Sequence, residues 1–260
     1  MRTMNTRVWP VAALAVVAVA ALMGSCAEPG PPSAAGGSTD AAAQTTGTPA
    51  KILQAVDSPR LSSVDAVGST AEVTGEASTS PGDATRTLWY ATVAGAALAH
   101  VDGLDKVERR VLDASGSTLD RETDPVALTK EMDPFAPLTL SSSEIRSQVD
   151  TAAASIDAKV VDVHYVALFG GAAEVVVQPD DVAKFVGSAG STTNTLLGSL
   201  GQDRHPYLVT IVDGDGAAQL ILSFIPGIGG TNGQGMAWAA PGLQTDAIWG
   251  VPDVAPTPSA

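Results

Sequence analysis

Along most of the chain, hydrophobic residues recur with a period of two or in short unbroken runs, which predicts β-strands. Glycine, aspartate and serine separate neighbouring runs at intervals typical of hairpin turns. Four hairpins are therefore expected, at 64–67 with 71–75, 107–112 with 117–120, 159–168 with 172–178, and 207–212 with 219–225.

Three other segments have the spacing of helices. Ser141 and Glu144 have the sequence of a capping box, and apolar residues then recur on one helical face. A second helix is expected after Pro179, because two aspartates begin a stretch with apolar residues on one face over 182–189. Residues 86–101 are apolar almost all round, which is typical of a buried helix.

The order of these elements repeats, which predicts a tandem duplication of a helix–hairpin–helix–hairpin unit. Chance matches among common residues are the alternative, but the shared order of elements favours duplication. The matched segments are 51–57 with 144–150, 64–65 with 161–162, 71–73 with 173–175, and the turn at 113–116 with that at 213–216, at offsets of 93, 97, 102 and 100 residues. The expected fold class is α+β, with antiparallel hairpins forming one or two sheets and helices packed on their apolar face.

Composition divides the rest of the chain. Residues 27–49 contain no large apolar side chain, so they are expected to form a flexible tether, and the proline-containing tail 251–260 is similar. The expected organisation is a signal segment at 1–25, a linker at 26–49, a first half at 50–125, a connector at 126–140, a second half at 141–250, and the tail at 251–260.

The first 26 residues have the pattern of an exported protein. Arg2 and Arg7 precede a run of 13 apolar residues, and Gly24, Ser25 and the only cysteine, Cys26, follow it. A basic start, a short apolar stretch and small residues are the parts of a secretory signal peptide. The run is shorter than the 20 or so residues of a membrane-spanning helix. The lone cysteine also has no disulfide partner, so another role is expected for it.

The sequence LMGSC at 22–26 resembles the lipobox of bacterial lipoproteins, with Met23 where leucine is usual. The resemblance implies that Cys26 is lipidated (a palmitate-type anchor) and that the chain is cleaved before it. It implies a mature protein held on the extracytoplasmic face of the cell membrane. Members of this class carry more than one acyl chain, which gives a stable anchor where one chain would hold only marginally. The alternatives are a plain signal peptide and a single membrane-spanning helix with an incidental cysteine.

Charge restricts the classes of partner. Removal of residues 1–25 takes away Arg2 and Arg7, which leaves 12 basic and 28 acidic residues and a formal charge of −16. Such a chain is repelled by nucleic acids and by anionic lipid headgroups, so neither is expected to bind it directly. The membrane is expected as a partner only through the lipid anchor.

A few polar residues could carry chemistry. Asp162 and His164 alternate on one predicted strand, and Glu174 on the neighbouring strand could face them. Such a set could bind a metal or act as a general base. We favour the alternative, a solvated polar face with Val161, Val163 and Tyr165 turned inward. Neither a metal nor a cofactor is therefore expected.

The C-terminal aromatic residues are candidates for binding. Trp238 and Trp249 follow the last predicted strand, so they could line a groove, although packing is the favoured role. The glycine-rich stretch 226–235 is expected to be a mobile loop or wide turn, because no helix follows it to complete a phosphate cradle. The leading hypothesis is a non-catalytic binding or accessory domain for an envelope protein or small ligand. An enzyme using Asp162, His164 and Glu174 and a carrier of hydrophobic molecules remain alternatives.

Overall fold

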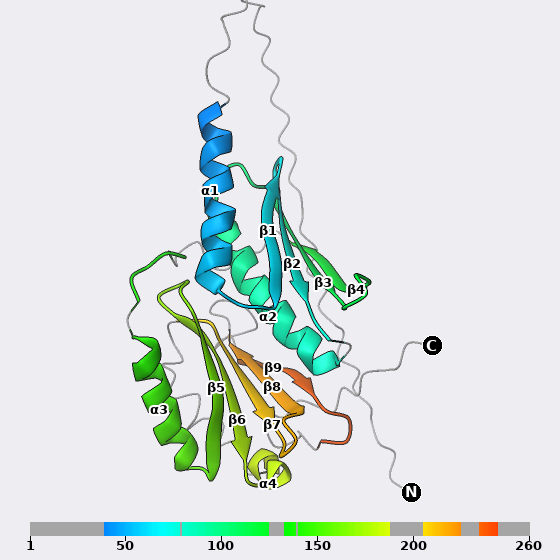
Figure 1. Ribbon diagram of the computed structural model, residues 1–260, viewed down its shortest axis with the longest axis vertical. Coiled ribbons are helices and arrows are strands. Elements are labelled where there is room, and N and C mark those ends of the chain that lie inside the picture. The colour runs from blue at the N-terminus through cyan, green and yellow to red at the C-terminus, as the bar shows by residue number, and fades with distance from the viewer. Residues whose placement is uncertain are drawn as a thin grey trace, which may run out of the picture. The chain divides into compact units, whose positions relative to one another are not determined.

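The computed structural model describes residues 39–78, 80–124, 133–138, 140–187, 205–224 and 234–243, all within the compact unit Gly37–Ala260. Helices and strands alternate along this part of the chain (Figure 1). Their order is α1 Thr39–Val56, β1 Leu61–Val67, β2 Thr70–Glu76, α2 Pro81–Leu98, β3 Lys106–Leu112, β4 Thr118–Asp124, α3 Ser142–Ala154, β5 Ala158–Val166, β6 Ala172–Pro179, α4 Val182–Gly187, β7 Tyr207–Val212, β8 Ala218–Phe224 and β9 Gln234–Ala239.

The strands form two separate sheets, which confirms the α+β class. Sheet A has the order β1-β2-β3-β4, and sheet B has the order β5-β6-β7-β8-β9. In both sheets the two hairpins are antiparallel and meet at a central parallel pair, β2 with β3 and β6 with β7. Two parallel strands that follow each other along the chain need a crossover connection. Between β2 and β3, the crossover segment of the chain contains α2.

The pairing registers show the expected duplication in detail. Val73 stands opposite Val64 and Arg109, and Val175 stands opposite Val163 and Val209. The first hairpins of the two halves also carry a register shift at the same place, as do the second hairpins. Two halves that share strand order, direction, register and irregularities are therefore two copies of one α-β-β-α-β-β unit.

One detail of the sequence alignment is wrong. The registers make Val163 the counterpart of Val64, not Val161, so the offset of this strand is 99 residues and not 97. Val161 sits where the register shifts between Val160 and Asp162, and its side chain is 50% exposed. A β-bulge adds one residue to a strand and so breaks the alternation on which the inward placement of Val161 depended.

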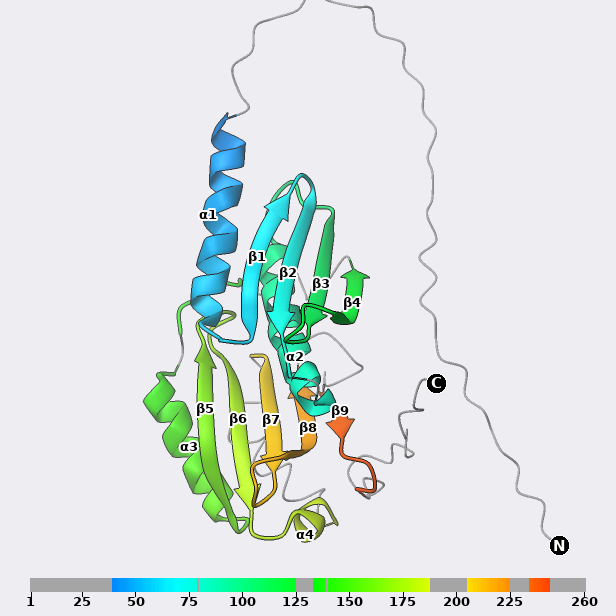
Figure 2. The same cartoon turned by 45° about the vertical axis from the view of Figure 1, so that its right-hand side comes forward.

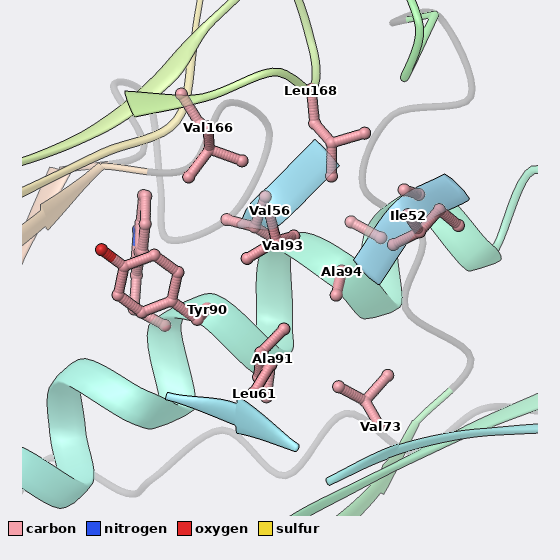
Figure 3. Packing of buried hydrophobic residues seen from close by; sticks show 14 of the residues in the cluster. Ile52, Val56, Leu61, Val73, Tyr90, Ala91, Val93, Ala94, Val166 and Leu168 are labelled. Carbon is pink, nitrogen blue, oxygen red and sulfur yellow. The ribbon is translucent and has the colours of Figure 1, made fainter. Parts of the chain in front are cut away.

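Helix α2 is the centre of the main hydrophobic core. It is buried over most of its length and packs against sheet A and against β8 and β9 of sheet B. Side chains from both halves meet around it, including Val73 from sheet A and Val166 from sheet B (Figure 3). A helix that is apolar all round fits this position, because both of its sides face a sheet. The prediction of a buried helix here is confirmed.

The inner strands of sheet B, β6 and β7, are buried on both faces. One face joins the core around α2 through residues such as Leu208 and Ile221. The other face forms a second core with α3 and α4, which contains Val175, Val209 and Phe185. The strands β6 and β7 accordingly read as almost continuous apolar runs. The capping box at the start of α3 is present, with Ser141 and Glu144 bonding reciprocally.

Two elements differ from expectation. Helix α1 begins at Thr39, so residues 39–49, which the sequence placed in the linker, are helical. The lack of large apolar side chains excludes a core there but not a helix, because alanine favours helix strongly. Strand β9 was not expected at all, since glycine and alanine occupy half of its six positions and neither favours strands. Residues 1–38, residues 126–132 and 139 of the connector, and the tail lie outside the described residues.

Candidate functional site

Glu174 is the most deeply buried carboxylate in the described part of the chain, at 3% exposure, and it lies between sheet B and α2. The Tyr90 hydroxyl donates a hydrogen bond to its Oε2 at 2.6 Å, and the Thr210 hydroxyl donates to its Oε1 at 3.3 Å. The Arg86 side chain forms an ion pair with the same Oε1. We call these four residues the Glu174 cluster.

Local structure brings the Glu174 cluster together. Arg86 and Tyr90 are four residues apart on α2, so they lie on one side of the helix. Glu174 and Thr210 come from the neighbouring strands β6 and β7 and face that side. The partners are 84 and 88 residues apart in sequence, so they join the two halves of the chain.

The electrostatics of the cluster favour a structural role. Burial and the nearby charge of Glu174 raise the pKa of Tyr90 well above its ordinary value of 10, so the hydroxyl stays protonated and remains a donor. Three donors occupy the carboxylate, and one of them carries the opposite charge. A buried carboxylate that is paired and hydrogen-bonded in this way has few free lone pairs for a substrate or metal.

His164 also contacts residues of the first half. It stands opposite Glu174 in the β5–β6 pairing, and its ring meets the Tyr90 ring edge-on with centroids 5.6 Å apart. Its Nε2 lies 2.9 Å from the carbonyl oxygen of Val56, the last residue of α1, to which it donates because a carbonyl can only accept. A histidine at a helix C-terminus satisfies an otherwise free carbonyl.

The predicted set of Asp162, His164 and Glu174 is therefore brought together only in part. Asp162 is exposed, and its Oδ1 accepts a hydrogen bond from the adjacent Val163 N–H. Among the described residues, no group of three or more acidic, histidine or cysteine side chains could hold a metal ion. The expectation that His164 lies on a solvated face is also wrong, because α2 covers that face of sheet B and half-buries the ring.

Trp238 is placed by β9. It stands opposite Ile221 in the β8–β9 pairing and packs, partly buried, on the core around α2. A Cβ atom added to Gly82 at the start of α2 would lie 3.1 Å from the Trp238 ring, so the close contact depends on glycine at that position. The packing role is what the structure shows for Trp238, and Trp249 lies outside the described residues.

We expect Trp238→Ala to lower the free energy of unfolding by about 2–3 kcal/mol, somewhat less than for a fully buried tryptophan. Urea unfolding at constant m-value measures this loss. Leu119→Ala is a suitable control, because Leu119 is 42% exposed on the outermost strand of sheet A and little burial is lost. An unchanged unfolding midpoint in the Trp238 variant would contradict the packing role.

Sheet A presents a face that differs in character from its counterpart in sheet B. The helices that contact sheet A, α1 and α2, pack on the face that carries Val64, Val73 and Val107. The opposite side, which we call the open face, carries Asp65, Glu72, Thr74, Glu108, Arg110 and Arg121. The register-equivalent residues of sheet B are His164, Glu174, Val176, Leu208, Thr210 and Ile221.

The substitutions between these equivalent positions explain why α2 covers this face in sheet B, whereas in sheet A the helices of the described segments lie on the other face. Leu208 and Ile221 are buried against the core around α2, whereas their counterparts Glu108 and Arg121 are charged. Arg110 and Arg121 both form ion pairs with Glu108, and the hydrogen bond from Arg121 holds the pKa of Glu108 below its ordinary range. A terminal repeat needs such a polar outer face to remain soluble.

The outer edge of sheet A differs from that of sheet B in a second way. In sheet B, β9 pairs with β8. In the described part of sheet A, β4 is the outermost strand on the corresponding side (Figure 2). The backbone of an edge strand offers unpaired donors and acceptors along one side. Sequence reasoning missed this feature, because an edge is recognised only when the pairing order is known.

Two further observations concern the alternative functions. A cleft lined by described residues, among them Leu140, Ile145 and Tyr207, has a volume of about 10 Å³, which is room for about one water molecule and not for a lipid. No helix in the described segments has both the length and the apolar character that crossing a membrane requires.

No family model matches the chain, and no curated protein matches it. Among solved structures, the chain is similar to a sex pheromone precursor from Lactobacillus salivarius subsp. salivarius, at 10% sequence identity and a TM-score of 0.25. The match covers 64% of this chain and 60% of that one, so this chain covers less than two thirds of the length of that protein. A TM-score of 0.25 does not show a shared fold.

Proposed function

We propose that this chain is a lipid-anchored protein of the cell envelope whose folded part is a non-catalytic module that binds a partner protein along β4. The observation that carries the proposal is the contrast between the two halves. In sheet B, α2 of the first half covers the equivalent face and β9 extends the equivalent edge, while β4 and the open face of sheet A carry charged residues instead. Anchoring at Cys26 rests on the signal and lipobox pattern.

The roles of the candidate catalytic residues also support a binding module. Both carboxylate oxygens of Glu174 and the Nε2 of His164 make contacts that hold the two halves together. A general base or metal ligand must instead direct a free lone pair at a substrate or ion. Asp162, which is exposed, has neither of these residues as a hydrogen-bond partner in the described contacts.

The test is site-specific photo-crosslinking in intact cells, with a photoreactive amino acid at Leu119 and, as a matched control, at Val161. Both are exposed apolar residues on edge strands, at 42% and 50% exposure, so non-specific capture should be equal at the two sites. We expect one discrete protein adduct at position 119 and none at position 161. Equal labelling at both positions, or no adduct at 119, would overturn the proposal.

A further inference from the structure

We infer that β4 accepts an extended, basic segment of the partner as a fifth antiparallel strand of sheet A. This inference rests on the proposed function and specifies how the module binds and which chemistry it selects. Addition of a strand to an exposed edge is a common mode of peptide recognition, in which backbone hydrogen bonds supply affinity and alternate side chains supply specificity.

The protein contains its own template for such a complex. Val111 pairs with Asp120 and Ile211 pairs with Leu220, so β4 and β8 are equivalent with an offset of 100 residues. Strand β9 runs antiparallel to β8, with Ala239 opposite Leu220 and Trp238 opposite Ile221. A strand in the same place on β4 would therefore lie opposite Asp120 and Arg121.

The side chains of β4 indicate the sequence of that strand. Asp120 and Glu122 stand opposite Val111 and Arg109, so they lie on the side of sheet A that faces α2, and Arg121 lies on the open face. The residues at the positions of Asp120 and Glu122 in β8 are Leu220 and Leu222, which stand opposite the apolar β9. With acids in place of leucines, β4 favours lysine or arginine at two alternate positions and an acidic or uncharged residue between them.

A second copy of this chain does not satisfy the same requirement. Two β4 strands that pair antiparallel about a two-fold axis must keep equivalent sides of the sheet together. One register then places Arg121 opposite Arg121 and Asp120 opposite Glu122, and a shift by two residues places Asp120 opposite its own copy. Like charges directly opposite each other are destabilising, so pairing between the β4 strands of two copies of this chain is disfavoured.

Charge on an edge strand also protects it from unwanted pairing, and the two roles are compatible. The charges of β4 exclude apolar strands and other copies of the chain, while a basic strand turns the same charges into favourable pairs. The formal charge of −14 for the whole chain adds long-range attraction for a basic partner.

The probe is a nine-residue peptide of threonine and valine with lysine at two alternate positions, titrated against the full chain in detergent. Fluorescence anisotropy measures binding, and hydrogen exchange locates it. We expect binding that slows amide exchange in residues 118–124. The same peptide with N-methyl groups on the backbone nitrogens that face β4 should bind at least about tenfold more weakly, because strand addition needs those donors.

Charge reversal tests the selectivity. Asp120→Lys should weaken binding of the lysine peptide about tenfold and improve binding of a glutamate peptide, since an attractive cross-strand pair becomes repulsive. Asp120 takes part in no ion pair among the described residues, so this variant should fold, and its thermal melt provides the check. Glu122→Lys is a second variant of the same design, although it also removes the ion pair with Arg109.

The outcomes separate this inference from the proposed function. Equal binding of the N-methylated peptide, protection outside 118–124, or no binding of the lysine peptide would overturn strand addition. If crosslinking at Leu119 succeeded in the same strain, β4 would still be the binding surface, contacted through side chains alone. If crosslinking also failed, the proposed function would fall with the inference.

Discussion

Arg86→Ala is expected to lower the free energy of unfolding by about 3–5 kcal/mol, the range for a buried ion pair that loses one partner. The Glu174 carboxylate is 3% exposed, and only the Tyr90 and Thr210 hydroxyls would remain to stabilise its charge. Chemical denaturation at pH 7 measures the loss. Because the Glu174 cluster joins α2 to sheet B, the variant should also expose the interface between the halves to proteolysis.

Arg146→Ala is the matched control. Arg146 forms an ion pair with Asp150 four residues away on α3, and both side chains are about half exposed, at 43% and 50%. Surface pairs of this kind contribute about 0.3–0.5 kcal/mol, so the control should unfold almost as the parent does. A loss in Arg86→Ala no larger than that in Arg146→Ala would show that the cluster does not hold the halves together.

The Glu174 cluster shows what the sequence could and could not predict. Glu174 is the one charged residue in the strand AAEVVVQP, and a carboxylate within an apolar run needs a partner when the strand is buried on both faces. That pattern could have indicated a buried ion pair. The identity of the partners could not be predicted, because Arg86 and Tyr90 come from the other half, and the packing of one half on the other has no local signal.

Local patterns predicted the hairpins and the order of elements well, for an equally physical reason. Turn residues and the alternation of side chains act over a few residues, so the hairpin of β7 and β8 and the capping box of Ser141 are visible in the sequence. The β-bulge beside Val161 interrupts the alternation, and β9 lacks branched residues, so both escaped that reasoning. The polar character of the open face of sheet A could be recognised only from the registers, which show that Glu108 is equivalent to Leu208 in the other half.

Cys26→Ser is expected to abolish lipidation and cleavage at this site, the largest change we predict in where the protein resides. Thiolates are far stronger nucleophiles than hydroxyls, and the chain holds no other cysteine that could accept the lipid. Each buried CH₂ contributes about 0.8 kcal/mol, so two or more acyl chains anchor firmly. Phase partitioning in detergent, followed by mass spectrometry of the N-terminal peptide, measures both effects.

The parent protein should enter the detergent phase with an N-terminal peptide that begins at Cys26 and carries the mass of its acyl chains. The serine variant should keep residues 1–25 and show no added mass. Ser25→Ala is the control, because it preserves a small residue before the cysteine and should be processed normally. Parent and serine variant both in the aqueous phase, or a parent peptide without added mass, would show that Cys26 is not an anchor. The binding module would then have to reach its partner from solution.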